Sequence, residues 1–212
     1  MKPDPDDEDD SEIEETFEPN TPMEELSIQI PSLIMGKLVE SSIIVFNHDH
    51  CTFLYNGGRY FGKPIGVRKP KGEQYFHRPL ELSFIEAYYL LKKKKLQIFN
   101  PQNEKHITLD ELAAHAKTFY DNFMDQYEIY EDLREKGYIV RPGLKFGADF
   151  AVYKKGPGID HSPFLIQVLP KTAKLSAKDI VLAGRLANSV KKKFIIANAL
   201  NRTYYGFKWY KP

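Results

Sequence analysis

Three side chains in the C-terminal half of this sequence have the types needed for acid–base chemistry. Tyr153 ends a run with strand character, His161 follows it across a loop, and Lys192 lies in the middle of a lysine triplet. A phenol can orient or accept a proton, an imidazole can donate one near neutral pH, and an ammonium group can stabilise negative charge. The three residues are compatible with an acid–base site beside a basic surface.

The segment that ends at Tyr153 has the pattern of a strand. Over residues 145–153, alternation along the strand places Asp149, Ala151 and Tyr153 on one face. The next strand is predicted over residues 163–169. The loop between the two strands is able to fold the histidine back towards the tyrosine.

The lysine triplet stands between a predicted helix over residues 176–189 and a predicted strand over residues 194–197. Alternation into that strand makes Lys192 face opposite to Lys191 and Lys193. The apolar side of the helix is predicted to consist of Ile180, Leu182, Ala183 and Leu186.

Each of these residues also has an ordinary structural interpretation. A strand tyrosine is usually half-buried packing, and a loop histidine is usually solvated. A lysine triplet at the end of a helix commonly interacts with the helix dipole. Residue type and spacing alone do not decide between these interpretations and a catalytic one.

The rest of the chain is predicted to mix strands and helices. Runs rich in β-branched and aromatic residues predict strands over residues 27–40, 42–45, 51–55, 59–67, 75–76, 138–141 and 204–209. Helical spacing predicts helices over residues 83–96 and 118–136, with another that begins near residue 109. The N-terminal strands are expected to form a small antiparallel sheet.

Three segments that resemble ligand sites are better explained as turns. His48-Asp49-His50-Cys51 offers four metal ligands in a row, but they cannot converge from an extended strand, so a turn between Val45 and Thr52 is expected. Gly57-Gly58 and Gly156-Pro157-Gly158 lack the spacing of a nucleotide-binding loop. No metal site and no cofactor is predicted.

The composition predicts a mixed α/β protein with a charged tail. Residues 1–18 hold ten of the 29 acidic residues, and from residue 19 onward 29 basic and 19 acidic residues leave a net charge of +10. A body this basic favours a polyanionic partner, although a solvated lysine-rich surface would have the same composition. The predicted domains are a disordered acidic tail (1–25), a small N-terminal α/β domain (26–110) and a C-terminal catalytic domain (111–212).

Cellular location is constrained by the lack of membrane and secretion signals. No apolar run approaches the roughly 20 residues that span a bilayer, and the acidic N-terminus does not resemble a signal peptide. The single cysteine, Cys51, cannot form an internal disulfide. We therefore expect no membrane association and a cytoplasmic location, or a nuclear one in a eukaryote.

Four segments carry a resemblance to a known family, the tRNA-splicing endonucleases of archaea and eukaryotes. The longest, which resembles the signature segment of the family, is Tyr138-Ile139-Val140-Arg141-Pro142-Gly143-Leu144-Lys145-Phe146-Gly147-Ala148-Asp149-Phe150. His161-Ser162 is similar to the histidine loop of the family, and residues 185–193 resemble its helix-to-lysine segment. Residues 82–91 resemble the helix of its N-terminal domain.

The resemblance implies a fold, a reaction and a set of site residues. The C-terminal domain is expected to be a restriction-endonuclease-like mixed-sheet nuclease, with Tyr153, His161 and Lys192 as its catalytic residues. The implied reaction is metal-independent cleavage of precursor tRNA at bulge-helix-bulge sites, which leaves 2′,3′-cyclic phosphate and 5′-hydroxyl ends. Arg185 and Trp209 correspond to residues that clamp a bulge base, while Lys191 and Lys193 are expected to contact phosphate or solvent.

The resemblance also implies assembly with a second endonuclease subunit, as a homotetramer or a heterotetramer. Residues 198–202 correspond to an interface loop that is acidic in self-assembling members of the family, whereas this loop contains Arg202 and no acid. That departure counts against the homotetramer.

Three alternatives remain open from the sequence. The first is a non-catalytic, RNA-binding subunit of the same complex. The second is a nucleic-acid-binding module that uses its basic body and its 13% aromatic residues for stacking. The third is a metal-dependent nuclease of a related fold, for which only Asp149 stands near the expected acidic cluster.

Overall fold

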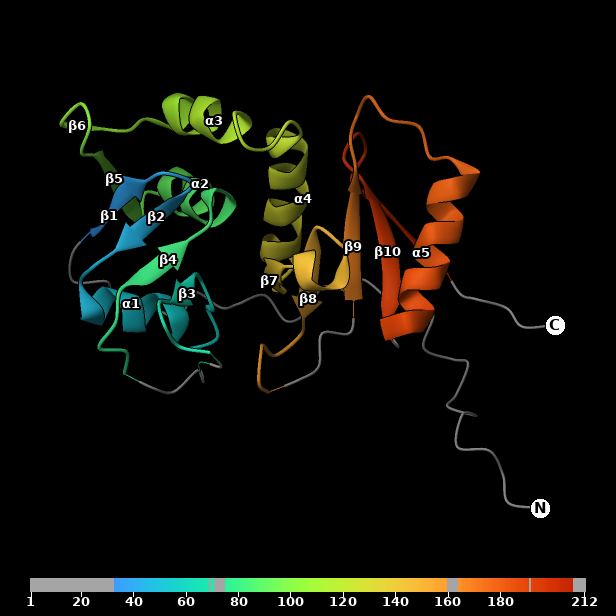
Figure 1. Cartoon of the computed structure of the whole chain (residues 1–212), viewed down its shortest axis with the longest axis horizontal. Helices are drawn as coiled ribbons and strands as arrows, with labels where there is room; N and C mark the ends of the chain where they lie inside the picture. The colour runs from blue at the N-terminus through green and yellow to red at the C-terminus, as the bar shows by residue number, and fades with distance from the viewer. Residues whose placement is uncertain (1–32, 69, 71–74, 160–163, 191, 208–212) are drawn as a thin grey trace, which may run out of the picture.

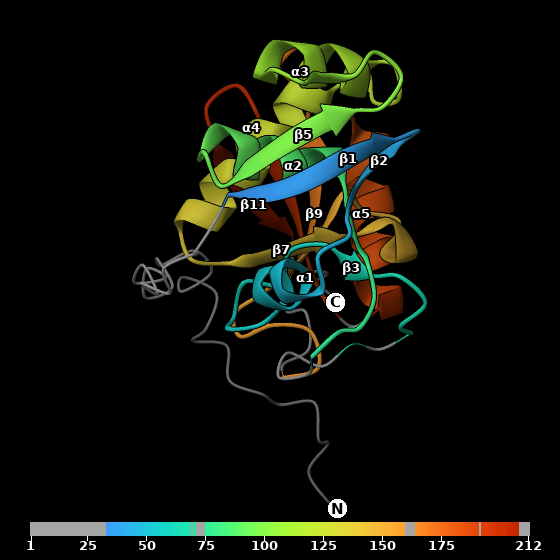
Figure 2. The same cartoon turned by 90° about the vertical axis from the view of Figure 1, so that its left-hand side faces the viewer.

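A computed structural model describes residues 33–207, except for residues 69, 71–74, 160–163 and 191. Two mixed sheets stand side by side, with helix α4 (Phe123–Glu135) between them (Figure 1). A view turned by 90° places the N-terminal sheet in front of the C-terminal one (Figure 2). The predicted mixed α/β class with two domains is confirmed. Within the described part of the chain, no helix is long and apolar enough to cross a membrane.

The N-terminal domain is built on a sheet with the strand order β3-β4-β2-β1-β5-β6. Its central strand β1 pairs with β2 antiparallel and with β5 parallel. The strands are β1 (Ile34–Val39), β2 (Ser42–Val45), β3 (Lys63–Pro64), β4 (Leu80–Leu82), β5 (Leu96–Asn100) and β6 (Lys105–His106). The helices are α1 (His48–Tyr55), α2 (Phe84–Lys92) and α3 (Leu109–Lys117).

Capping boxes fix where two of these helices begin. The Ser83 hydroxyl accepts from the backbone N–H of Glu86, and the Glu86 carboxylate accepts from the backbone N–H of Ser83. Thr108 and Glu111 repeat the arrangement at α3. Each box satisfies backbone donors that have no partner within the helix. The predicted helices near these positions are confirmed.

The C-terminal domain is a five-stranded sheet with the order β11-β10-β9-β8-β7. Strands β9 and β10 are parallel, which requires the crossover that α5 (Ala177–Val190) provides, and the other pairs are antiparallel. Helix α4 packs on one face of the sheet and α5 on the other (Figure 1). The strands are β7 (Ile139–Pro142), β8 (Phe150–Tyr153), β9 (Phe164–Leu169), β10 (Lys193–Asn198) and β11 (Thr203–Phe207).

The strand predicted over residues 51–55 is wrong, because these residues belong to helix α1. Asn47 caps the helix by accepting from the backbone N–H of His50. Cys51, Leu54 and Tyr55 are buried at helical spacing. The turn expected for His48 to Cys51 is wrong for the same reason, since these residues form the first turn of α1.

Other boundaries also differ from the prediction. Residues 75–76 form no strand, and the run over residues 59–67 reduces to the two residues of β3. Strands β5 and β6 were not predicted. Strand β8 begins only at Phe150, because the residues after Gly143 form a 3₁₀ turn, η2 (Leu144–Phe146), which Gly147 ends with a φ of 70°.

The predicted apolar side of α5 is only partly buried. Ala183 packs into the core with 2% exposure, whereas Ile180 and Leu182 are 39% and 61% exposed. Over residues 177–185, the part of α5 whose side chains the structure describes, the inward face is narrower than the apolar residues suggest; Leu186 lies outside that part.

Candidate active site

The register of the C-terminal sheet brings Tyr153 and Lys192 to the same end of the sheet. Val152 of β8 pairs with Phe164 of β9, and Phe164 pairs with Lys193 of β10. Tyr153 and Lys192 each lie one residue beyond this row, at the same end of the sheet. Neighbouring strands are about 4.7–4.9 Å apart, so the backbones of Val152 and Lys193, two strands apart, are about 10 Å apart.

Both residues belong to the face of the sheet that α5 covers. Ala151 and Phe194 are buried in the cluster beneath α5. Ala151 lies two residues before Tyr153, and Phe194 lies two residues after Lys192, so alternation puts each pair on the same face. Tyr153 itself packs against that cluster. Lys193, the first residue of β10, lies on the other face of the sheet and is exposed. The predicted opposition of Lys192 and Lys193 matches this arrangement, while Lys191 lies outside the described residues.

Lys192 is held beside an aromatic ring. Its Nζ lies 5.4 Å from the centroid of Phe146, and the Nζ of Lys145 lies 5.6 Å from the same centroid. Contacts of this kind favour an ammonium group over the ring face. Partial burial lowers the pKa of Lys192 below its ordinary value. Lys192 thus presents a positive charge that is less strongly hydrated than that of a fully exposed lysine.

Tyr153 connects the two domains. It is half-buried and packs against the core of the N-terminal domain as well as the cluster beneath α5. Burial raises the pKa of Tyr55 in the N-terminal domain, and the Tyr153 phenol is close enough to raise it further. Tyr153 is therefore oriented by both domains at the end of β8.

The remaining predicted site residues are only partly placed. Arg185 is exposed on α5, on the helix that leads to Lys192. His161 and Trp209 lie outside the described residues. Of the predicted catalytic residues, the structure brings Tyr153 and Lys192 to one face of the sheet.

Asp149 is not on the predicted face with Ala151 and Tyr153. It lies in a bend before β8, and its carboxylate accepts from the Nε2 atoms of Gln126 (2.8 Å) and Gln167 (2.7 Å). A third donor is the backbone N–H of Val168, at 2.7 Å. Burial raises the pKa of Asp149, and the hydrogen bonds from Val168 and Gln126 oppose the rise. Asp149 fastens the turn before β8 to β9 and α4, which is a structural task.

Comparison with known proteins gives two matches along the chain. Residues 34–113 match the model of the tRNA intron endonuclease N-terminal domain, and residues 123–203 match that of its catalytic C-terminal domain. A protein of Hyperthermus butylicus named tRNA-splicing endonuclease is 39% identical over 184 residues, which covers 85% of this chain and 100% of that protein. This chain belongs to the tRNA-splicing endonuclease family.

Two further members of the family agree with this assignment. The tRNA-splicing endonuclease of Sulfurisphaera tokodaii is 42% identical over 182 residues, covering 84% of this chain and 99% of that protein. That of Saccharolobus solfataricus is 38% identical over 183 residues, covering 84% and 100%. The resemblance seen in the sequence is confirmed at the level of the family, which is a family of enzymes. Tyr153 and Lys192 both fall within the catalytic-domain match.

The sequence analysis gave no role to Phe146, whose ring lies beneath the Nζ of Lys192. The signal was weak, because Phe146 was assigned to a strand rather than to η2. The pair Gly143 and Gly147 around it was the available indication of a tight turn. A Cβ at Gly143 would lie 2.7 Å from the backbone of Phe150, so this turn is packed too closely for a larger residue.

Within the described residues, no group of three or more His, Cys, Asp or Glu side chains is arranged to hold a metal ion. His48 and His50 are in α1.

Proposed function

We propose that this chain is a tRNA-intron endonuclease that cleaves precursor tRNA at bulge-helix-bulge splice sites. The proposed reaction needs no metal ion and leaves a 2′,3′-cyclic phosphate and a 5′-hydroxyl end. The observation that supports it best is that Tyr153 and Lys192 lie at the same end and on the same face of the sheet, within the matched catalytic domain. Family membership supports tRNA as the substrate.

In this scheme the nucleophile is the 2′-hydroxyl of the substrate, and Tyr153 orients that hydroxyl or accepts its proton. A phenol has a pKa near 10, so ionising it at pH 7 costs about 4 kcal/mol, at about 1.36 kcal/mol per pKa unit. Lys192 lies on the same face of the sheet, and its positive charge would lower the cost of ionising the Tyr153 phenol. Orientation of the hydroxyl by a neutral phenol avoids this cost altogether.

We assign Lys192 to the negative charge that builds up on the phosphorane-like transition state. Its ammonium group is partly shielded from water over Phe146, where an electrostatic interaction is stronger than in bulk solvent. Its lowered pKa also makes the ammonium group a better proton donor than an ordinary lysine.

We assign the role of general acid to His161. An imidazole with a pKa of about 6.5 is partly protonated near neutral pH and can deliver a proton to the departing 5′-oxygen. In the sequence, His161 lies in the loop between β8 and β9. A loop in this position could bring the imidazole close to Tyr153, which ends β8. The three roles together supply a proton acceptor or orienter, a charge stabiliser and an acid.

For substrate recognition we propose that Arg185 and Trp209 hold a flipped-out bulge base between them. A guanidinium group and an indole can contact both faces of a base through cation–π and stacking interactions. Arg185 is exposed on α5, which supports its availability to RNA. Lys191 and Lys193 are proposed to contact phosphates.

We further propose that the enzyme works as a homo- or hetero-oligomer with a second endonuclease subunit. The loop between β10 and β11 is the proposed interface element. It contains no acid, and Leu200 in it is 68% exposed. In this chain, an apolar contact through Leu200 would then take the place of the acidic contact that self-assembling members of the family make with this loop.

A single assay tests the function. Purified full-length chain is incubated with an intron-containing precursor tRNA, in EDTA and separately in magnesium, and the product ends are analysed. Cleavage in EDTA with cyclic phosphate ends supports the proposal. Binding without cleavage would instead indicate an RNA-binding subunit, and cleavage only in magnesium would indicate a metal-dependent nuclease.

A further inference from the structure

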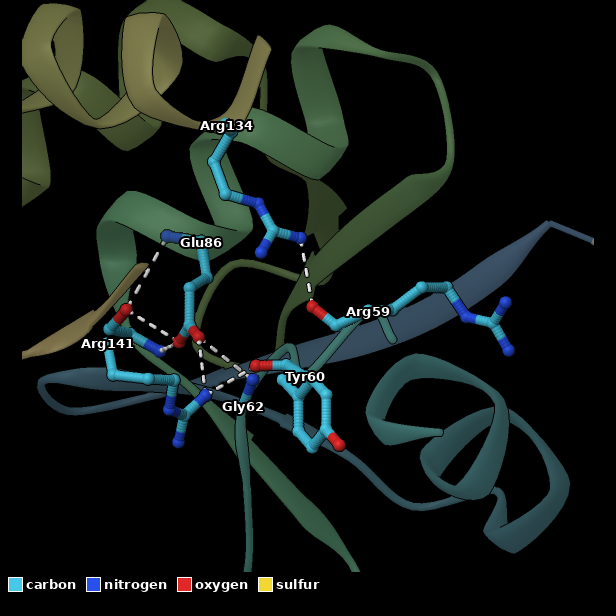
Figure 3. Close-up of polar contacts among 7 residues, drawn as sticks. Arg59, Tyr60, Gly62, Glu86, Arg134 and Arg141 are labelled. Atoms are coloured by element: carbon cyan, nitrogen blue, oxygen red, sulfur yellow. Dashed lines mark hydrogen bonds and ion pairs between the residues drawn. The ribbon is translucent and has the colours of Figure 1, made fainter. Parts of the chain in front are cut away.

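Residues 59–62 of the N-terminal domain are held at the domain junction by three side chains (Figure 3). The Nη2 of Arg134 donates to the carbonyl of Arg59 at 2.9 Å, and the Nη1 of Arg141 donates to the carbonyl of Tyr60 at 2.6 Å. The backbone N–H of Gly62 donates to the Glu86 carboxylate at 2.9 Å. These bonds fix both ends of a short segment by means of α4, β7 and α2.

The charged side chains of the junction are buried. Glu86 is 3% exposed and Arg134 is 5% exposed, and the Arg134 guanidinium lies over the ring of Phe61 at 4.1 Å from its centroid. Tyr60 is 2% exposed and has a φ of 50°. A positive φ is uncommon for a bulky residue and persists where the surroundings determine the conformation. The backbone of Tyr60 is therefore set by the junction rather than by local preference.

The ring of Tyr60 reaches the segment that follows Tyr153. A Cβ built on Gly156 would lie 2.4 Å from the Cε2 and 2.7 Å from the Cζ of Tyr60, so only glycine allows this approach. Gly156 also has a φ of 124°, which side chains rarely permit. Gly158, two residues later, has a φ of 86° but no atom within 4 Å of its Cβ position.

Tyr60 and Tyr153 meet the same part of the N-terminal core. Tyr60 packs edge-to-face on Tyr55 with centroids 5.3 Å apart. Tyr153 packs against the same buried cluster and raises the pKa of Tyr55, which burial has already raised. Strand β7, which carries Arg141, pairs with β8, and Arg141 stands opposite Ala151. The junction thus contacts β8 through β7, which carries Arg141, and contacts the segment after β8 through Tyr60.

We propose that Tyr60 is a positioning residue for RNA cleavage, because its ring fixes the path of the chain at Gly156, three residues after the candidate catalytic Tyr153. This inference rests on the function proposed above. The N-terminal domain then contributes directly to the geometry of the active site, although it supplies no catalytic group in the scheme. A change at the contact should slow the chemical step and leave RNA binding intact.

The first test is Gly156→Ala with Gly158→Ala as its matched control. Both substitutions place a Cβ on a backbone with positive φ, but only the first meets the Tyr60 ring. We expect Gly156→Ala to lower the single-turnover cleavage rate at least tenfold, with precursor affinity within twofold of the original enzyme. Gly158→Ala should cleave within threefold of the original rate.

The second test removes the ring edge instead. Tyr60→Leu should slow cleavage with unchanged precursor affinity, and Tyr60→Phe, which retains the ring, should restore the rate. Combining Gly156→Ala with Tyr60→Leu should cost less than the product of the two single effects, because the shorter side chain makes room for the new methyl group. If Gly156→Ala does not fold, the comparison of Tyr60→Leu with Tyr60→Phe decides the question.

Lys192→Ala separates failure of this inference from failure of the proposed function. If the original enzyme does not cleave either alone or with its second subunit, or if Lys192→Ala cleaves normally, the proposed function or its site is wrong. If Lys192→Ala is slow while both Gly156→Ala and Tyr60→Leu cleave within twofold of the original rate, the positioning role of Tyr60 is refuted. Equal loss in Gly156→Ala and Gly158→Ala would also overturn it.

Discussion

The domain junction and the candidate active site use charged groups in opposite ways. At the junction, the Glu86 carboxylate accepts from Gly62, from the backbone and hydroxyl of Ser83, and from Arg141, all within 3.1 Å. At the candidate site, Lys192 is partly exposed and lies over a ring at 5.4 Å. The buried Glu86 carboxylate, with these contacts, holds structure, whereas the partly exposed Lys192 side chain can be reached by a substrate.

Removing the junction carboxylate should have the largest effect, and the effect should be on stability. Glu86→Ala leaves Arg141, whose side chain is 16% exposed, without its ion pair and removes the capping box of α2. Breaking a buried pair in this way costs about 3–5 kcal/mol. Urea unfolding measures the loss.

The control is Glu135→Ala, which breaks an ion pair with Lys93 whose partners are 50% and 44% exposed. Exposed pairs are worth about 0–1 kcal/mol. Similar losses in the two variants would contradict the contrast between the regions.

Removing the candidate catalytic ammonium should act on rate instead. Lys192→Ala is expected to slow single-turnover cleavage by about 10²–10³, equivalent to about 2.7–4 kcal/mol, the scale of one transition-state electrostatic contact. Its unfolding free energy should stay close to that of the original enzyme because the side chain is only partly buried. Lys193→Ala, on the other strand face, should weaken RNA binding without slowing cleavage by bound enzyme.

Removing Trp209, one of the two residues proposed to hold the bulge base, should have a smaller effect, again on RNA binding or cleavage rather than on stability. Trp209→Ala should reduce binding or cleavage at bulges by about 1–3 kcal/mol, the value of one base–aromatic stack. The melting temperature should move by no more than about 1–2 °C. A large fall in melting temperature with normal cleavage would show that Trp209 is a packing residue, since loss of a core tryptophan costs about 3–5 kcal/mol.

The smallest expected effect is a pH dependence at another contact between the domains. Burial alone would raise the pKa of Glu131, but hydrogen bonds from Lys92 and Tyr127, both at 2.8 Å, hold it below its ordinary value of 4.5. A lowered folded-state pKa stabilises the fold above pH 4.5, and this contribution is lost as the pH falls through the folded-state pKa.

The stability difference between the original enzyme and Glu131→Gln should therefore be constant from pH 7 to about 5 and shrink at lower pH. Urea unfolding of both proteins between pH 7 and 3 measures it. A difference that does not vary with pH would show that the ionised form of Glu131 is not what the fold prefers.

Local signals in the sequence predicted much of the fold. The helices that begin after Ser83 and Thr108 were predicted from helical spacing, and the structure adds a capping box at the start of each. The strands around residues 164–169 and 193–198 were predicted from apolar runs. Helix α1 was missed because its eight residues include threonine and aromatic side chains that also suit strands. Its Asn47 cap and the spacing of its buried residues were the better signal.

The sequence proposed site residues but did not indicate the contacts around them. Tyr153 and Lys192 were proposed from their types and from the family resemblance, and the structure places them at the same end of the sheet. The contact between Tyr60 and Gly156 joins positions far apart in the chain, and no local pattern marks it. Arg141 was visible only as part of a motif, because its partner Glu86 lies 55 residues earlier.

That separation has a consequence for synthesis on the ribosome. At about 5–20 residues per second, Arg141 is polymerised roughly 3–11 s after Glu86, which is 55 residues ahead of it. During that interval the Glu86 carboxylate can already accept from Ser83, within the same helical turn. The contacts between Ser83 and Glu86 can therefore form before Arg141 exists, and Arg141 is added last to the group of donors around this carboxylate.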